Sequence, residues 1–188
     1  MKRLAAVIAS LLFILPVHAR NIDGVAIPET LTLSGEKSPL VLNGAGLRTR
    51  YLAKVYVAAL YLAQPASQPE AVLDSSAGRV IGIHMRRDTD SEQIATAFLT
   101  SVAKNHERAE MQVLQDRLSQ FKLMMPTMKR NDVLRLEFLP NGETRVVFNN
   151  QVQGILKGAD FQRALLKIWL GTKPVDADLK RALLGIRL

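Results

Sequence analysis

The stretch that decides the fold is Lys54-Val55-Tyr56-Val57-Ala58-Ala59-Leu60-Tyr61-Leu62. From position 55 onward nearly every side chain is apolar, at odd and even positions alike. A strand that is buried on both faces has this pattern, whereas a strand with one solvent-exposed face alternates between apolar and polar residues. We therefore expect this segment to be a strand at the centre of a sheet.

Further strands are expected upstream of this segment. Residues 22–33 and residues 40–62 are rich in Val, Ile, Leu, Thr and Tyr and are separated by glycine and proline. Such composition between turn residues is typical of strands. The longer stretch is predicted to form two strands, with the break either near residues 44–46 or near Arg50.

Two helices are expected in the middle of the chain. Residues 64–78 are polar, contain two prolines and predict a loop with one short helical turn, and residues 80–85 predict another strand. Apolar residues then recur three and four positions apart over residues 91–102 and again over residues 106–122. Asp90 can supply a capping oxygen at the start of the first helix.

The last third of the chain predicts a hairpin, one more strand and two helices. Asn141-Gly142 is a strong hairpin signal between two apolar stretches. The elements expected around and after it are strands at 133–138, 144–148 and 152–156, a helix from a cap at Asp160 to Leu170 that Gly171 ends, and a helix from Asp176 to Leu184. A mostly antiparallel sheet with helices inserted mid-chain and at the end belongs to the α+β class.

The chain has the length of one domain behind a removable leader. It contains 188 residues, of which 48% are hydrophobic. Lys2 and Arg3 precede an uncharged run that ends in Val17-His18-Ala19, which is the pattern of a signal peptide. A membrane anchor is the alternative, but the run is shorter than the roughly 20 residues that a spanning helix needs. We predict cleavage after Ala19, with residues 1–19 as signal peptide, residues 20–188 as a single domain, and a periplasmic or secreted location.

Net charge and residue usage reduce the number of possible functions. The formal net charge is +8, but the basic residues are interleaved with acidic ones, which argues against a nucleic-acid partner and favours anionic lipid head groups or anionic small molecules. There is no cysteine, and His84 and His106 are the only histidines after the leader. We therefore expect no metal and no cofactor. Gly44-Ala45-Gly46 lacks the third glycine and the following helix of a dinucleotide loop.

Two stretches of the sequence carry a family resemblance. One runs from Leu42-Asn43-Gly44-Ala45-Gly46-Leu47-Arg48 into the strand at residues 54–62, and the other is residues 161–171 with Pro174-Val175-Asp176 after it. Together they resemble the beginning and the closing helices of the chalcone-isomerase-like family, in its bacterial exported branch. The resemblance spans essentially all of the expected domain.

The resemblance implies a curved, mostly antiparallel sheet backed by a layer of helices, with a ligand cleft between the two layers. The family includes isomerases that close chalcones into rings and non-catalytic relatives that bind fatty acids. Arg48 stands at the position of the arginine that meets the anionic oxygen of the ligand. Tyr56 stands where the isomerases have a ketone-polarising threonine and the fatty-acid binders have a tyrosine that contacts the carboxylate.

Departures from the isomerase pattern favour a binding protein. The isomerases also use a tyrosine and an asparagine on a mid-chain helix and a threonine on the penultimate helix. Here residues 91–102 contain neither of the first two, and Ile168 stands near the threonine position. The chain between Arg48 and Lys54 is also shorter than in the plant enzymes. We therefore expect an exported, non-catalytic binding protein for a small amphipathic anion such as a fatty acid, and assign no catalytic residue.

Two other functions stay open, as do structural roles for the site residues. The protein could be a chalcone-isomerase-type intramolecular lyase that acts on an enone, or an interaction module with no small ligand. Arg48 could instead pair with a neighbouring acid, and Tyr56 could be an ordinary core tyrosine. Lys54 fits a solvated strand position better than a second contact to the anion.

Overall fold

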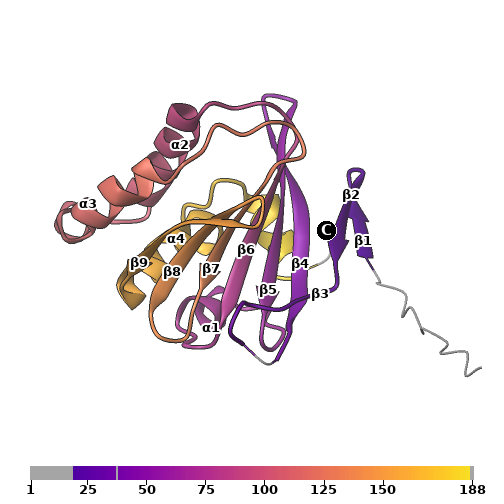
Figure 1. The fold of residues 1–188 in the computed structure, drawn as a ribbon, viewed down its shortest axis with the longest axis horizontal. Helices are drawn as coiled ribbons and strands as arrows, with labels where there is room; N and C mark the ends of the chain where they lie inside the picture. The colour runs from indigo at the N-terminus through magenta and orange to yellow at the C-terminus, as the bar shows by residue number, and fades with distance from the viewer. Residues whose placement is uncertain (1–18, 37, 187–188) are drawn as a thin grey trace, which may run out of the picture.

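The computed structural model describes residues 19–36 and 38–186, so all of the expected signal peptide except Ala19 lies outside the described residues. Its main feature is a seven-stranded sheet whose neighbours are all antiparallel (Figure 1). The strands follow chain order: β3 (Thr30–Leu31), β4 (Leu40–Arg50), β5 (Ala53–Leu62), β6 (Arg79–Met85), β7 (Val133–Phe138), β8 (Glu143–Phe148) and β9 (Gln151–Lys157).

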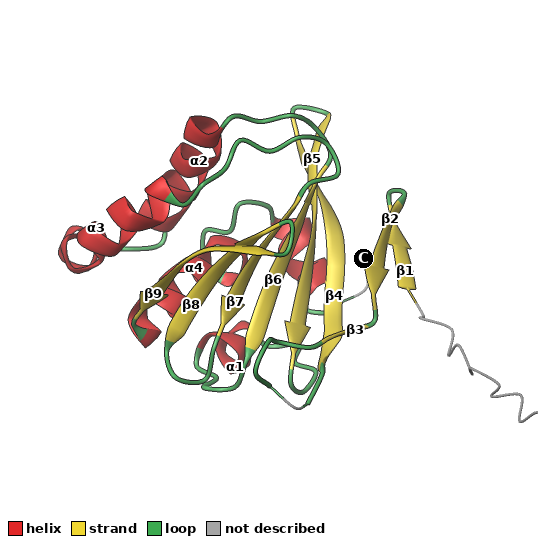
Figure 2. Cartoon of the chain, in the orientation of Figure 1, coloured by secondary structure: helices red, strands yellow, loops and turns green. Residues whose placement is uncertain are grey.

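The sheet is curved and its inner face is covered by helices, which confirms the predicted α+β class (Figure 2). The helices are α1 (Pro69–Leu73), α2 (Ser91–Ala103), α3 (Arg108–Leu123), α4 (Ala159–Leu170) and α5 (Ala177–Leu183). A separate hairpin of β1 (Ala19–Ile22) and β2 (Val25–Pro28) precedes the sheet. Among the described helices, none combines the length and the apolar composition needed to cross a bilayer.

Strand β5 is buried on both faces, as its composition predicted. Ala58 and Leu60 point into the larger core beneath the helices, whereas Val57 and Tyr61 point into a smaller core beneath the N-terminal segment. On the second face the Tyr61 hydroxyl donates a hydrogen bond to the carbonyl of Pro28 at 3.0 Å. The two cores explain why the strand shows no alternation between apolar and polar residues.

The break between β4 and β5 lies at Tyr51-Leu52, so the alternative near Arg50 is confirmed and the one at residues 44–46 is wrong. Gly44 and Gly46 lie inside β4, where α5 packs directly on the strand. A Cβ atom on Gly44 would lie 2.7 Å from the carbonyl oxygen of Leu183, closer than van der Waals contact allows. These glycines therefore serve the close approach of a helix, not a turn.

Most helix boundaries follow their predicted capping residues, with one exception. Asp90 accepts a hydrogen bond from the backbone nitrogen of Gln93, and Asp176 does the same for Leu179. The predicted cap at Asp160 is wrong, because α4 already begins at Ala159 after Gly158. The Asp160 carboxylate instead pairs with both terminal nitrogens of Arg117 on α3, each at 2.6 Å. Gly171 ends α4 as predicted.

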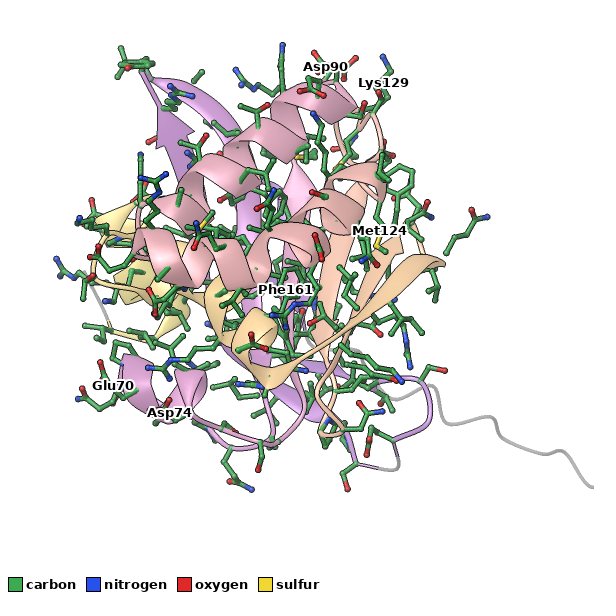
Figure 3. All side chains as sticks on the ribbon, turned by 90° about the vertical axis from the view of Figure 1, so that its left-hand side faces the viewer. Glu70, Asp74, Asp90, Met124, Lys129 and Phe161 are labelled. Atoms are coloured by element: carbon green, nitrogen blue, oxygen red, sulfur yellow. The ribbon has the colours of Figure 1, made fainter. Side chains whose placement is uncertain are left out.

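Aromatic rings tie the helices into one layer. Phe98 of α2 lies edge-on to Phe121 of α3 and to Trp169 of α4, with ring centroids 5.1 and 6.0 Å apart. Phe121 in turn contacts Phe161 of α4 at 6.0 Å. In Figure 3, where α2 and α3 lie in front of the sheet, the labelled Phe161 lies near the centre of this packed layer.

Candidate functional site: a cavity between the sheet and α2

A cavity of about 760 Å³ lies between the inner face of the sheet and helices α2 and α4. Small-molecule sites are typically about 300–1,000 Å³, so this volume is sufficient for a ligand with a long apolar chain. Its walls combine polar and apolar side chains, and the apolar ones include Val55, Ile83, Ile94, Phe98, Leu134 and Ile168. These six residues belong to strands and helices of the packed core, which makes the cavity a preformed feature of the fold.

Arg48 and Tyr56 meet at one end of this cavity. They are directly opposite each other in the antiparallel pairing of β4 with β5, and both line the cavity. The Arg48 guanidinium carbon lies 5.4 Å from the centroid of the Tyr56 ring. The two residues singled out from the sequence therefore lie together in the cavity wall.

The Arg48 guanidinium interacts with the Tyr56 side chain but, among the described residues, has no carboxylate to pair with. Its Nε atom is buried and lacks a hydrogen-bond partner, and within residues 19–36 and 38–186 no acidic side chain pairs with Arg48. The Asp176 carboxylate, whose charge acts on Tyr56, is engaged at the N-cap of α5. A buried donor without a partner carries a desolvation cost, so an acceptor that enters the cavity would be stabilised there.

Tyr56 is held in place by a residue that sequence reasoning did not identify. The indole Nε1 of Trp169 donates a hydrogen bond to the Tyr56 hydroxyl at 3.0 Å. Burial raises the pKa of Tyr56 above its usual value, and the charge of Arg48 opposes that rise only partly. The phenol therefore stays protonated at neutral pH, and its own proton can be donated to a further acceptor.

A second unpartnered polar atom faces the same cavity. Thr89, in the segment between β6 and α2, has a buried hydroxyl with no hydrogen-bond partner and lines the cavity. Nothing in the sequence distinguished this threonine from the capping residues around it. Neither Trp169 nor Thr89 carries a local motif, because the role of each depends on contacts with distant parts of the chain.

The remaining residues considered from the sequence lie elsewhere. The exposed Lys54 pairs with Asp23, which also accepts from Arg86 at 3.1 Å, and it does not line the cavity. His84 and His106 are half-buried, and His106 Nδ1 lies 2.8 Å from the carbonyl oxygen of Val102. Among the residues that the structure describes, no three histidine or acidic side chains gather as a metal site.

A curved antiparallel sheet that encloses an amphipathic cavity against helices defines an α+β domain built around a small-ligand pocket. The model of the chalcone isomerase-like family matches residues 19–185, so the chain belongs to this family. The resemblance seen in the sequence is thereby confirmed. No curated protein matches the chain.

A solved structure supports the same fold. The crystal structure of a fatty-acid binding protein from Arabidopsis thaliana superposes with a TM-score of 0.68, at 18% sequence identity, over 86% of this chain and 92% of that one. At this identity the likeness establishes the fold, and the ligand has to be argued from the cavity itself.

Proposed function

We propose that this protein binds a small amphipathic anion, most specifically a fatty acid, with the carboxylate at Arg48 and Tyr56 and the acyl chain in the cavity. The observation that carries the proposal is the buried, unpartnered Nε of an Arg48 guanidinium that lies beside the Tyr56 ring. A guanidinium presents a fixed fork that matches the two oxygens of a carboxylate, and a phenol can donate one more hydrogen bond.

The apolar walls supply the rest of the affinity. Burying a methylene group stabilises a complex by about 0.8 kcal/mol, so a long acyl chain needs no further polar contact. The Arabidopsis protein is described as a fatty-acid binding protein, and its similar fold supports the same ligand class here. The ligand needs one anionic end and one apolar end, since the cavity offers the Arg48–Tyr56 pair beside apolar side chains such as Phe98.

The identity of the bound molecule can be read directly. Lipids extracted from the purified mature protein are measured by mass spectrometry under denaturing conditions. We expect fatty acids in near-stoichiometric amount, or uptake of added fatty acid reported by the fluorescence of Trp169, the single tryptophan of the chain. An empty protein that takes up no fatty acid would support the interaction-module function instead.

We further propose that the protein does not catalyse ring closure. That reaction needs a positioned nucleophile and donors where charge develops on the ketone oxygen. Ile168 lines the cavity near the position of the family threonine, and α2 contains neither tyrosine nor asparagine. Loss of chalcone absorbance should match the rate without protein. A stereoselective flavanone product that disappears in Arg48→Met would establish the isomerase function.

Export is the last part of the proposal. Cleavage after Ala19 would leave Arg20 as the first residue, and the β1–β2 pairs from Arg20↔Ile27 to Ile22↔Val25 would be kept. The Arg20–Glu29 ion pair would also remain. N-terminal sequencing of the protein from the cell envelope should begin near Arg20, and recovery of chains that begin at Met1 from the cytosol would contradict export.

A further inference from the structure

The turn between β4 and β5 exposes the two most accessible large apolar side chains of the described residues. Tyr51 is 90% exposed and Leu52 is 101% exposed. In Figure 1 this turn lies at the upper end of the sheet, far from α1. The other exposed large apolar residues are two on α3, two on β9 and Ile186, so among the described residues only Tyr51 and Leu52 are adjacent in the chain.

The backbone of this turn is strained by the residues it carries. Tyr51 and Leu52 have φ angles of 48° and 65°, in the left-handed region that favours glycine and asparagine. A two-residue hairpin turn of this geometry usually has Asn-Gly. Neither side chain contributes to the core, so the fold gains nothing from the two apolar residues. Strain without a structural benefit indicates a function outside the chain.

Basic residues surround the turn where the cavity opens. Arg50, Arg87 and Lys104 are exposed, line the cavity, and form no ion pair within residues 19–36 and 38–186. The guanidinium carbon of Arg50 also lies 5.3 Å from the centroid of the Tyr51 ring. The acid at this rim, Glu92, is paired with Lys122 at 2.9 Å. The opening of the cavity is therefore positively charged.

We propose that this protein docks on an anionic lipid bilayer through the Tyr51-Leu52 turn, with Arg50, Arg87 and Lys104 at the head groups and the cavity opening toward the lipid. Two apolar side chains are too few for a stable protein interface, which buries roughly 800 Å² on each partner. They suit the interfacial region, where aromatic and aliphatic residues insert and basic residues meet anionic lipids. Exchange of a fatty acid with the bilayer rests on the proposed function, whereas docking does not.

The test is flotation of the ligand-free mature protein with two kinds of vesicle, phosphatidylcholine alone and phosphatidylcholine mixed with phosphatidylglycerol. The key variant is Tyr51→Asn with Leu52→Gly, which removes the apolar tip and supplies the residues that the turn geometry favours. The matched control is Leu123→Asn on α3, which removes a side chain that is 85% exposed. Melting temperatures of all variants are measured alongside.

Wild type and Leu123→Asn should bind the anionic vesicles at least tenfold more tightly than the phosphatidylcholine vesicles. The turn variant should lose at least tenfold in binding to anionic vesicles, with an equal or higher melting temperature. Arg87→Gln with Lys104→Gln should also weaken binding and flatten its salt dependence. Equal vesicle binding by wild type and the turn variant, or no binding by wild type, overturns docking. Fatty-acid uptake without vesicles reports on the proposed function alone.

Discussion

An arginine lies at each end of the helix-covered face of the sheet, and the two arginines differ in their hydrogen-bond partners. At one end Arg79 is 3% exposed, and its terminal nitrogens donate to the Val72 carbonyl at 2.9 Å and to Gln162 Oε1 at 2.7 Å. The Gln162 amide is held in turn by two carbonyl oxygens. At the other end, Arg48 Nε is buried without a hydrogen-bond acceptor among the described residues.

The difference shows that a buried arginine with a purely structural role has acceptor oxygens of the chain for its terminal nitrogens. Burial lowers the pKa of Arg79 to about 10, yet the group stays charged at neutral pH and two oxygens of the chain receive its protons. Arg48 has the same buried Nε without a partner, but it lines a cavity, and its guanidinium lies beside the Tyr56 ring and pairs with no carboxylate of the described residues. The acceptor that Arg48 lacks is therefore expected to be a ligand.

Removing Arg79 should have the largest effect and should act on stability. Arg79→Met leaves the Val72 carbonyl and Gln162 Oε1 without a charged donor, so we expect a loss of roughly 2–4 kcal/mol in the free energy of unfolding. Arg48→Met is the control, and should change this free energy by less than about 1 kcal/mol. Urea unfolding of both variants measures the difference. Similar losses would show that Arg48 has a structural role as well.

When binding is measured instead of stability, Arg48→Met should have a large effect. Methionine keeps the length of the apolar stem but cannot pair a carboxylate. Affinity for a fatty acid should fall by roughly 1.5–3 kcal/mol, the range for a hydrogen bond to a charged group, which is about a 10- to 150-fold weaker dissociation constant. Titration followed by Trp169 fluorescence provides the measurement. An unchanged affinity would leave Arg48 without a role in the site.

The smallest effect is expected at the tyrosines of β5, which lie on opposite faces of the strand. Tyr56→Phe removes one neutral donor from the cavity and should weaken fatty-acid binding by about 0.5–1.5 kcal/mol. Tyr61→Phe removes a similar hydrogen bond, to the Pro28 carbonyl, on the other face and should leave binding unchanged. Equal changes in affinity for the two variants would point to a general effect on β5 instead of a contact with the ligand.

The sequence predicted those parts of the molecule that depend on local pattern. The two-sided burial of β5, the periodicity of α2 and α3 and the Asn-Gly turn after β7 were all visible as spacing or turn chemistry. Two predictions, a break at residues 44–46 and a helix cap at Asp160, were wrong because of contacts with distant segments. Gly44 allows the close approach of α5, and the Asp160 carboxylate pairs with Arg117 on α3. The turn at Tyr51-Leu52 contradicts ordinary turn chemistry, so the sequence predicted it only as one of two alternatives, near Arg50.

Sequence reasoning selected Arg48 and Tyr56, which both line the cavity, and did not identify Trp169 or Thr89. Arg48 and Tyr56 came from the family resemblance, and the hairpin between β4 and β5 explains why they lie opposite each other. Trp169 could not be placed from the sequence, because its hydrogen bond to Tyr56 joins residues that are far apart in the chain. An aromatic residue on an amphipathic helix predicts only a core position.

The most direct test of the account is calorimetric titration of wild type and Arg48→Met with a fatty acid and with the alcohol of the same chain length. Both ligands bury the same methylene groups, but only the acid carries a charge for the guanidinium to pair. We predict that Arg48→Met costs roughly 1.5–3 kcal/mol of binding free energy for the acid and much less for the alcohol. Equal losses for both ligands would contradict the claim that Arg48 is the anion contact.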